Sequence, residues 1–381
     1  MKFIHLSDLH IGKRVNEFSM IEDQTYILKE ILQIMKDERP DGLLIAGDIY
    51  DKSIPTIEGI NLFDEFLTSV VRLGIPVYAI SGNHDSADRL NFGGRIMEAN
   101  HVYMTGVFDG TLKKVTMQDE HGPVNVYMLP FVKPAMVTPY YSEVESYEDA
   151  VKAIIDGTEI DTSERNILVA HQFVRSGTML PEQSESELES IGGLDQMDAS
   201  IFESFDYVAL GHLHGPQRIG RDTIRYAGSP LRYSFSEVKQ NKSVTVVSLG
   251  EKGNVSFELI PLHPMRDMRV IKGPITALTA KETYMQGNRE DYIHAILTDE
   301  DNIVDAIGRL RSVYPNIMKL EFENSMSKVN ENAKTSASDV QKKNPMELFE
   351  EFFVSQNNVE LKPEQKEIMR RVLERLEGER V

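Results

Sequence analysis

The stretch VYAISGNHD, residues 77–85, passes from an apolar run into three side chains that can bind a metal ion or carry a proton. The apolar part stops at Gly82, and Asn83, His84 and Asp85 follow without a gap. An amide, an imidazole and a carboxylate are more than a simple turn requires. We therefore interpret residues 77–80 as a strand that ends at a functional site.

Four other apolar runs end in side chains of the same kinds. Residues 3–6, 43–46, 167–170 and 207–210 are followed by Asp8 and His10, by Asp48, by His171, and by His212 and His214. Helical spacing of apolar residues at 20–37 and 57–73 separates the first runs, which predicts βαβ units and an α/β fold with a largely parallel sheet. Because ligands bind beyond the carboxyl ends of parallel strands, these side chains are expected to converge on one cleft.

Composition limits the class of protein. The chain has 381 residues, a formal net charge of −19 and no cysteine, so neither a disulfide framework nor a thiolate zinc site is expected. No apolar run reaches the roughly 18–20 residues of a membrane span, and the first residues enter a strand without the pattern of a signal peptide. These features predict a cytoplasmic protein without a membrane partner, although a secreted protein without disulfides would share them. The acidic charge argues against a protein that coats DNA, but not against a phosphodiesterase, because bound cations reverse the local field.

The second half of the chain predicts further units. Residues 177–194 are acidic and rich in Ser and Gly, which predicts a loop beside the site. A strand at 292–297, a helix at 302–313 and a strand at 317–322 form a small βαβ unit, and a polar segment follows it. Two amphipathic helices beyond Pro345 either fold back onto the main body or, as the polar linker favours, dock on a separate partner. We predict domains at 1–265, 266–324, 325–344 (a linker) and 345–381.

The predicted cluster fits the hydrolysis of a phosphodiester. This reaction needs a strong nucleophile at neutral pH and neutralisation of charge on the phosphoryl oxygens. Two cations about 3.5–4 Å apart achieve both, because they lower the pKa of a water and clamp the phosphate. A carboxylate can bridge two cations through its two oxygens, and Asp48, alone at its strand end, is the natural candidate.

The order and spelling of the motifs resemble the calcineurin-like metallophosphoesterase superfamily. The motifs are DLH (8–10), GD (47–48), GNHD (82–85), His171 and GHLH (211–214), and they span about the first 215 residues. The spellings HLSDLH (5–10), GDIYD (47–51) and AGSPLRYSF (227–235) are further similar to the SbcD family of Mre-type nucleases. This resemblance covers nearly the whole chain. It implies a four-layer β-sandwich flanked by helices, with residues 266–324 as a capping domain and residues 345–381 as a partner-binding segment.

The resemblance also implies a role for each matching residue. One metal would be held by Asp8, His10 and His214, the other by Asn83, His171 and His212, with Asp48 bridging. The family implies two Mn²⁺ ions, and this donor set also suits Fe²⁺, Zn²⁺ or Mg²⁺. The catalytic pair would be His84, placed over the scissile phosphate, and Asp85, which supports a ligand or His84 from behind.

The implied function is that of a DNA exonuclease and hairpin endonuclease in DNA repair and recombination. The resemblance implies that an SbcC-like ATPase opens duplex ends while this subunit cuts. It also implies a homodimer within a heterotetramer, formed by the helices around residues 60–73 and 93–98. Two alternatives remain open at this point. One is another phosphodiesterase or a phosphatase on the same fold, which would not need the capping domain and terminal helices; the other is a non-catalytic scaffold.

Overall fold

The computed structural model describes residues 1–187, 195–301 and 303–324, together with scattered positions between 346 and 369. The chain divides into two compact units, Met1–Arg269 and Val270–Val381. The predicted linker at 325–344, most of the predicted C-terminal helices and residues 188–194 of the predicted loop lie outside the described residues. In the part of the chain that is described, no helix has the length and apolarity that crossing a membrane requires.

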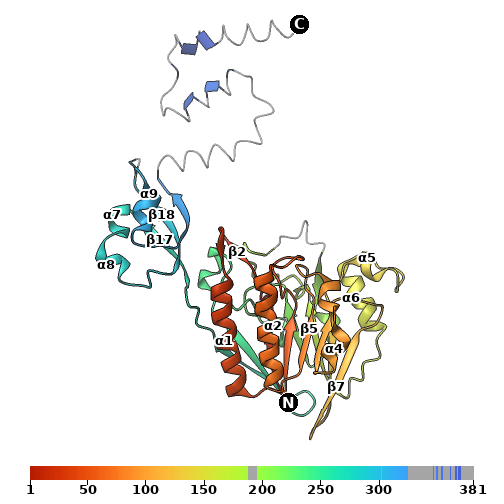
Figure 1. Cartoon of the computed structure of the whole chain (residues 1–381). Helices are drawn as coiled ribbons and strands as arrows, with labels where there is room; N and C mark the ends of the chain where they lie inside the picture. Colours follow the sequence, from red (N-terminus) through yellow and green to blue (C-terminus); the bar gives the residue numbers. More distant parts are fainter. Residues whose placement is uncertain are drawn as a thin grey trace. The chain divides into compact units, whose positions relative to one another are not determined.

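The first sheet of the larger unit carries three of the five predicted strand ends (Figure 1). Its strand order is β16 (Val255–Pro261), β15 (Ser243–Leu249), β1 (Lys2–Leu6), β4 (Gly42–Ala46), β5 (Val77–Ile80) and β6 (Val102–Thr105). The four strands β1, β4, β5 and β6 run parallel to one another. β15 is antiparallel to β1, and β16 is antiparallel to β15. Their parallel direction brings the loops after β1, β4 and β5 to one edge of the sheet.

The second sheet carries the other two strand ends. Its order is β13 (Gln217–Ile219), β14 (Arg221–Tyr226), β12 (Tyr207–Gly211), β9 (Arg165–His171), β8 (Gly122–Leu129) and β7 (Lys113–Asp119). The inner four strands are parallel, and β7 and β13 at the edges are antiparallel. Both sheets are therefore mixed, and the expectation of one largely parallel sheet holds only for four strands of each, β1, β4, β5 and β6 in the first and β14, β12, β9 and β8 in the second.

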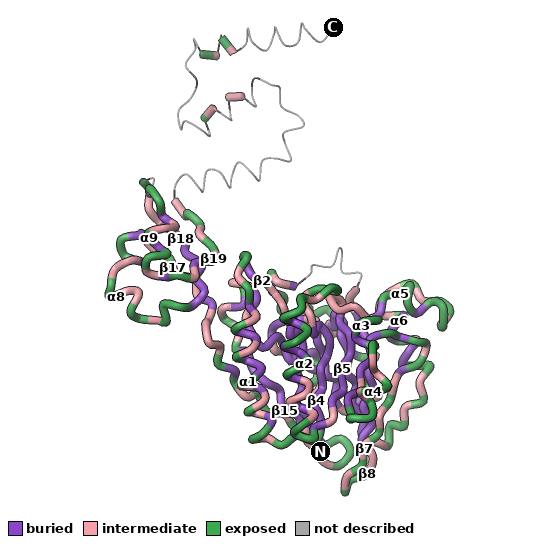
Figure 2. Tube along the Cα trace, in the orientation of Figure 1, coloured by how far each residue is buried: buried purple, intermediate pink, exposed green. Residues whose placement is uncertain are grey.

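The two sheets pack face to face over an apolar core. Phe3, Leu44 and Tyr78 of the first sheet lie in one buried cluster with Val126 and Val169 of the second. The central strands β4, β5, β9 and β12 are accordingly buried along their whole length, as Figure 2 shows for β4 and β5. Burial of both inner faces fixes the register of the strands, because a slip by one residue would turn apolar side chains outward.

Helices cover the outer faces of both sheets. On the first sheet these are α1 (Ile21–Glu38) and α2 (Ile57–Arg72), with the short helices α3 (Ala87–Asn91) and α4 (Gly94–Glu98) after β5. The second sheet packs its outer face against α6 (Tyr147–Asp156), next to α5 (Pro134–Val137). The layers are helix, sheet, sheet, helix, so the predicted α/β fold class, a four-layer sandwich, is confirmed.

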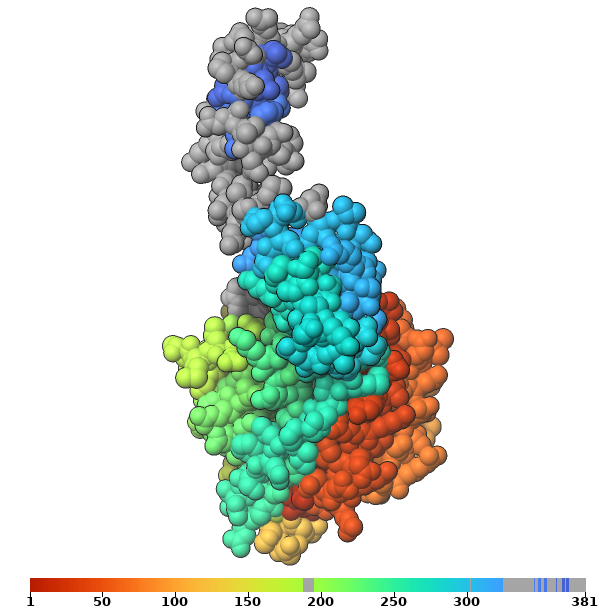
Figure 3. Space-filling model, turned by 90° about the vertical axis from the view of Figure 1, so that its left-hand side faces the viewer, coloured from red at the N-terminus to blue at the C-terminus, as the bar shows by residue number. Residues whose placement is uncertain are grey.

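The larger unit also contains several short elements. They are β2 (Arg14–Val15), β3 (Phe18–Ser19), β10 (Phe173–Arg175), β11 (Gln196–Asp198) and two 3₁₀ helices, Ala199–Phe202 and Phe235–Lys239. In Figure 3, the red residues of α1 lie beside the teal residues of β15 and β16. Arg266 joins this face to α1 through ion pairs with Glu22 and Asp23.

The smaller unit is built on a three-stranded sheet, β17 (Met268–Gly273), β18 (Tyr292–Leu297) and β19 (Ile317–Phe322). The predicted strands at 292–297 and 317–322 are confirmed, and they are parallel. The helix between them, α9 (Ala306–Arg311), is shorter than predicted, and it begins after Asp305, whose side chain caps it by accepting a hydrogen bond from Gly308. The short helices α7 (Ile275–Leu278) and α8 (Lys281–Tyr284) precede β18.

Candidate metal centre

Five strand ends, from β1, β4, β5, β9 and β12, bring all the predicted ligands to one end of the sandwich. Asp8, His10, Asp48, His171 and His214 are buried, and Asn83 and His212 are partly buried. The backbone is left-handed at Asp8 (φ 52°), His10 (φ 44°), Asp48 (φ 49°) and His212 (φ 113°). Residues other than glycine adopt this conformation at a cost in free energy, and such residues cluster at functional sites.

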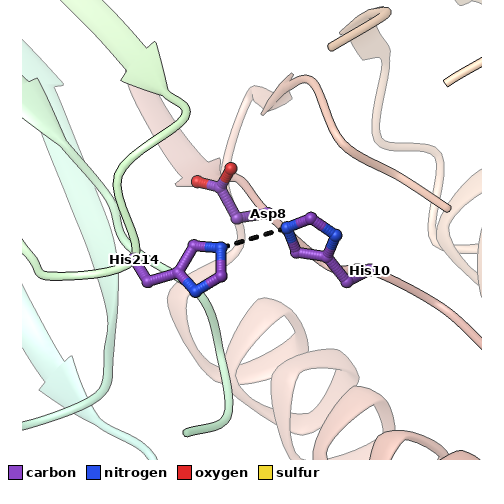
Figure 4. Close-up of side chains that lie close together, drawn as sticks. All are labelled: Asp8, His10 and His214. Carbon is purple, nitrogen blue, oxygen red and sulfur yellow. Dashed lines mark hydrogen bonds between the residues drawn. The ribbon is translucent and has the colours of Figure 1, made fainter. Parts of the chain in front are cut away.

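Asp8, His10 and His214 form the first group of donor atoms (Figure 4). Nε2 of His10 lies 3.1 Å from Nε2 of His214. The carboxylate of Asp8 accepts the backbone N–H of His212 at 3.0 Å, and the backbone N–H of Asp8 donates to Gly47. These contacts join the ends of β1, β4 and β12.

Asn83, His171 and His212 form the second group. Oδ1 of Asn83 lies 3.0 Å from Nε2 of His171 and 3.0 Å from Nδ1 of His212. Nδ1 of His171 lies 2.8 Å from the carbonyl of Ala46. Because a carbonyl oxygen accepts only, Nδ1 of His171 carries a proton, and its Nε2 is the nitrogen that faces the site.

Asp48 lies between the two groups. Its Oδ2 is 3.7 Å from Nε2 of His10 in the first group and 3.3 Å from Nε2 of His171 in the second. Its Oδ1 accepts the backbone N–H of His84 at 2.9 Å. A carboxylate in this position can contribute to both groups at once.

The donor set fits divalent cations. Carboxylate oxygens, an amide oxygen and imidazole nitrogens face one another in a buried space, where acceptors without hydrogens between them repel. Nε2 of His10 and Nε2 of His214, for example, are both buried and lie 3.1 Å apart. Cations would neutralise these lone pairs, and this mixture of nitrogen and oxygen ligands suits Mn²⁺, Fe²⁺ or Zn²⁺.

The protonation states of the imidazoles agree with this fit. Burial lowers the pKa of His212 to about 3 and that of His10 well below its usual value, so both are neutral near pH 7, the form that binds a metal. Burial lowers the pKa of His171 too, but the carboxylates of Asp48 and Asp8 raise it to about 9. A positive charge is thus favoured beside Nε2 of His171, where a proton or a cation can supply it.

His84 lies at the edge of the cluster and is partly buried. Its Nδ1 is 2.9 Å from the carbonyl of Asp51, which fixes the proton on Nδ1 and leaves Nε2 available. One nitrogen of His84 also lies within 4.8 Å of donor atoms of His10 and Asp48. The geometry is therefore compatible with a ligand as well as with a group that faces the substrate.

Asp85 joins two of the loops. Its carboxylate accepts the backbone N–H groups of Gly82 (2.9 Å), Ile49 (3.1 Å) and Tyr50 (2.9 Å). Burial and the charge of Asp48 raise its pKa to about 6, although these three hydrogen bonds oppose the shift. Since both oxygens are used on backbone amides, Asp85 holds the loop of Asp48 against the loop of Asn83, which is a positioning role.

Glycines permit the close approach of these loops. A Cβ atom on Gly82 would lie 2.1 Å from Oδ1 of Asp48, and one on Gly211 would lie 1.8 Å from the carbonyl oxygen of Ala46. Any larger residue at either position would push two strand ends apart.

Sequence reasoning missed a second layer of polar residues behind His214. Nδ1 of His214 contacts Ser186 Oγ at 2.8 Å and Glu237 Oε1 at 3.2 Å, and Glu187 accepts the backbone N–H of His214 at 2.6 Å. Lys242 pairs with Glu237 at 2.6 Å. Burial raises the pKa of Glu237, but Lys242 and His214 outweigh it and hold that pKa well below its usual range. Neither spacing nor periodicity marks these residues; the one signal is that Glu237 closely follows the AGSPLRYSF stretch.

Comparisons with known proteins agree with this geometry. Residues 1–216 match the family described as calcineurin-like phosphoesterase. Residues 264–357 match the family described as type 5 capsule protein repressor C-terminal domain.

An individual relative is similar over most of the chain. The SbcD component of the SbcCD nuclease of Staphylococcus epidermidis is 36% identical over 326 residues, which cover 84% of this chain and 85% of that protein. Among solved structures, a dimetal phosphatase from Danio rerio is 10% identical, with a TM-score of 0.39 over 68% of this chain and 95% of that one. A protein from Thermus thermophilus is 11% identical, with a TM-score of 0.40 over 68% of this chain and 98% of the other.

Proposed function

The chain belongs to the calcineurin-like phosphoesterases and, within them, to the SbcD family of SbcCD nuclease subunits, and from this membership we propose that it is a metal-dependent DNA nuclease. Its substrates are double-stranded and hairpin DNA, and it works with an SbcC-like ATPase that opens duplex ends. Because the proposed substrate is chromosomal DNA, the protein is located in the cytoplasm, at the nucleoid.

The observation that supports this proposal most strongly is the convergence of ligands. Five strand ends from two sheets contribute the donor atoms, and groups of three of them lie within 4.8 Å of one another. A protein that used this fold as a scaffold would not need a buried set of carboxylate and imidazole donors, because unpaired buried groups of this kind destabilise it.

The proposed chemistry divides the work among the residues. When bound, two divalent cations, with Mn²⁺ proposed, would lower the pKa of a water and neutralise the phosphoryl oxygens. Asp48 would span the two positions, with the first group of ligands on one side and the second on the other. His84, fixed through Asp51, would direct Nε2 toward the leaving oxygen and, when the ring carries a proton on both nitrogens, would protonate that oxygen. Asp85 would keep the two loops in register.

A cleavage assay tests this function against the phosphatase alternative. The full chain is incubated with Mn²⁺ or Mg²⁺ and with blunt duplex DNA, hairpin DNA or a small phosphate ester, with and without the ATPase. We expect Mn²⁺-dependent degradation of DNA and little turnover of the ester. Strong ester turnover without DNA degradation would refute the nuclease proposal, and no hydrolysis of any substrate would favour a scaffold.

We propose that the C-terminal segment, residues 345–381, binds the ATPase, that residues 266–324 form the capping domain and that residues 1–265 form the nuclease domain. At the described positions 349–350 and 353–354 the chain is helical, and the rings of Phe349 and Phe353 lie 6.4 Å apart on one side. An apolar side of this kind suits a helix that docks on another protein.

Deletion of residues 345–381 is expected to abolish co-purification with the ATPase and to leave the metal centre intact. The reason is that every predicted ligand lies within the first 214 residues. Co-expression and affinity purification check association, and calorimetry with Mn²⁺ checks the site. Unchanged association would place the contact elsewhere in the chain.

We further propose that the chain forms a homodimer through α2, α3 and α4. An apolar groove of about 660 Å³ lies between these helices, lined in part by Ile60, Phe63 and Phe92. Phe92 is 83% exposed and Ile96 is 76% exposed. Exposed apolar surface on this scale is typical of an interface.

Phe92→Asp is expected to convert the dimer into a monomer, because burying an unpaired charge in an apolar interface costs several kcal/mol. Analytical ultracentrifugation measures the mass. Leu180→Asp, an equal change at another exposed apolar residue, is the matched control and should remain dimeric. A Phe92→Asp protein that is still dimeric would exclude this surface.

A further inference from the structure

A buried ion pair lies directly behind one of the proposed ligands. Glu237 belongs to the 3₁₀ helix Phe235–Lys239, and its side chain is fully buried. One carboxylate oxygen faces Nδ1 of His214, and the other accepts from Nζ of Lys242 at 2.6 Å. Replacing a buried ion pair with apolar residues is often neutral or stabilising, so its presence here is weak evidence for a role in stability. Its contact with His214 suggests a role at the site.

Glu237 and Ser186 together fix the tautomer of His214. Ser186 Oγ lies between the two, at 2.8 Å from Nδ1 of His214, and donates its own proton to Glu237. The carboxylate therefore holds the imidazole proton on Nδ1, both directly and through the hydroxyl. The lone pair of Nε2 then faces the cluster, where Nε2 of His10 lies 3.1 Å away.

The backbone of His214 is held by the same network. Its N–H donates to Glu187, and its carbonyl accepts from Nζ of Lys242 at 2.8 Å. Lys242 also donates to Ser229 Oγ at 2.8 Å. Every polar group of His214 except Nε2 is thus bound to a neighbour, so the direction of Nε2 is determined by these contacts.

The second group of ligands lacks an equivalent carboxylate among the described contacts. Nδ1 of His171, its outer nitrogen, donates to the neutral carbonyl of Ala46 at 2.8 Å, whereas Nδ1 of His212 is one of the donor atoms and faces Asn83 within the group at 3.0 Å. A carboxylate behind an imidazole raises the basicity of the other nitrogen and strengthens its bond to a metal. The two proposed metal positions are therefore unequal.

We propose that Glu237 is a positioning residue which, through His214, strengthens the binding of the cation held by Asp8, His10 and His214. The cation held by Asn83, His171 and His212 does not depend on Glu237. This inference rests on the proposed two-metal site. It adds that the two positions bind their cations with different affinities.

The test is a calorimetric titration of the full chain with Mn²⁺ alone. It is carried out on wild type and on the Glu237→Gln variant. The substitution keeps the shape of the side chain and removes its charge. Loss of an outer partner of this kind lowers metal affinity about 10–100-fold. We expect one of the two binding events to weaken by that factor and the other to stay unchanged. Glu237→Gln in a His214→Ala background should weaken binding no further.

A second buried ion pair provides the matched control. Arg165 and Asp119 are paired in the same unit, with side chains 3% and 11% exposed. Arg165 begins β9 and His171 ends it, so this pair lies about 20 Å from the ligands. The variant Arg165→Met with Asp119→Asn should leave both Mn²⁺ affinities unchanged.

The outcomes separate the two proposals. A folded Glu237→Gln protein with both affinities unchanged, or with both lowered equally, overturns the role of Glu237. If wild type binds no Mn²⁺, the proposed function fails and this inference fails with it. If Glu237→Gln does not fold, ¹⁵N NMR of histidine-labelled, metal-free wild type provides the test. The signal of His214 is identified by its absence from the spectrum of His214→Ala. This signal must show a proton on Nδ1, and a proton on Nε2 would overturn the inference.

Discussion

Replacing Asp48 with alanine is expected to abolish Mn²⁺ binding at both positions and DNA cleavage with it. Oδ2 of Asp48 lies between Nε2 of His10 and Nε2 of His171, one from each group of ligands. Because loss of an outer hydrogen-bond partner alone lowers metal affinity about 10–100-fold, loss of the residue proposed to bridge both positions should lower both affinities by more than about 100-fold. Calorimetry and elemental analysis of the purified protein measure the metal content.

Two further variants make this result specific. Asp48→Asn can still accept the backbone N–H of His84 but offers one neutral oxygen, so it should lose metal as Asp48→Ala does and keep its fold. Asp37→Ala, at an exposed position on α1, should bind two Mn²⁺ ions. A full two-metal complement in Asp48→Ala would refute the bridging role.

The family and the fold class follow from sequence because both depend on local order along the chain. Each apolar run that ends in a ligand is a strand, and parallel neighbours place their carboxyl ends together. The strands ending at Ala46 and Ile80 pair in parallel, as do those ending at His171 and Gly211. Convergence of Asp48, Asn83 and His171 could therefore be predicted before any distance was known. The match of residues 1–216 to calcineurin-like phosphoesterases confirms the family.

The layer behind the ligands could not be predicted, because it depends on tertiary contacts. Ser186 and Glu237 are 51 residues apart and meet at His214, and nothing in their spacing predicts this contact. Asp85 illustrates the same limit. The sequence indicates a carboxylate next to His84, whereas the structure shows its oxygens bound to the backbone of Gly82, Ile49 and Tyr50. Hydrogen-bond direction is a property of the packed loops.

The sequence and the geometry allow different roles for His84. The family resemblance implies a group that faces the phosphate, while proximity to His10 and Asp48 also permits a ligand. The bond to the carbonyl of Asp51 favours the first role, because it fixes the ring at the edge of the cluster with Nε2 available. Metal content separates the two roles, since only a ligand is needed to retain the metals.

His84→Ala is expected to lower kcat for DNA cleavage about 10²–10⁴-fold, the usual contribution of a general acid or base, with both Mn²⁺ ions still bound. His84→Asn can still donate to Asp51 but cannot transfer a proton, so it should be equally slow, whereas His121→Ala, at an exposed position, should cleave as wild type does. Single-turnover cleavage and Mn²⁺ calorimetry on the same preparations measure both quantities. If His84→Ala loses a metal, His84 is a ligand, and the leaving oxygen must take its proton from another group.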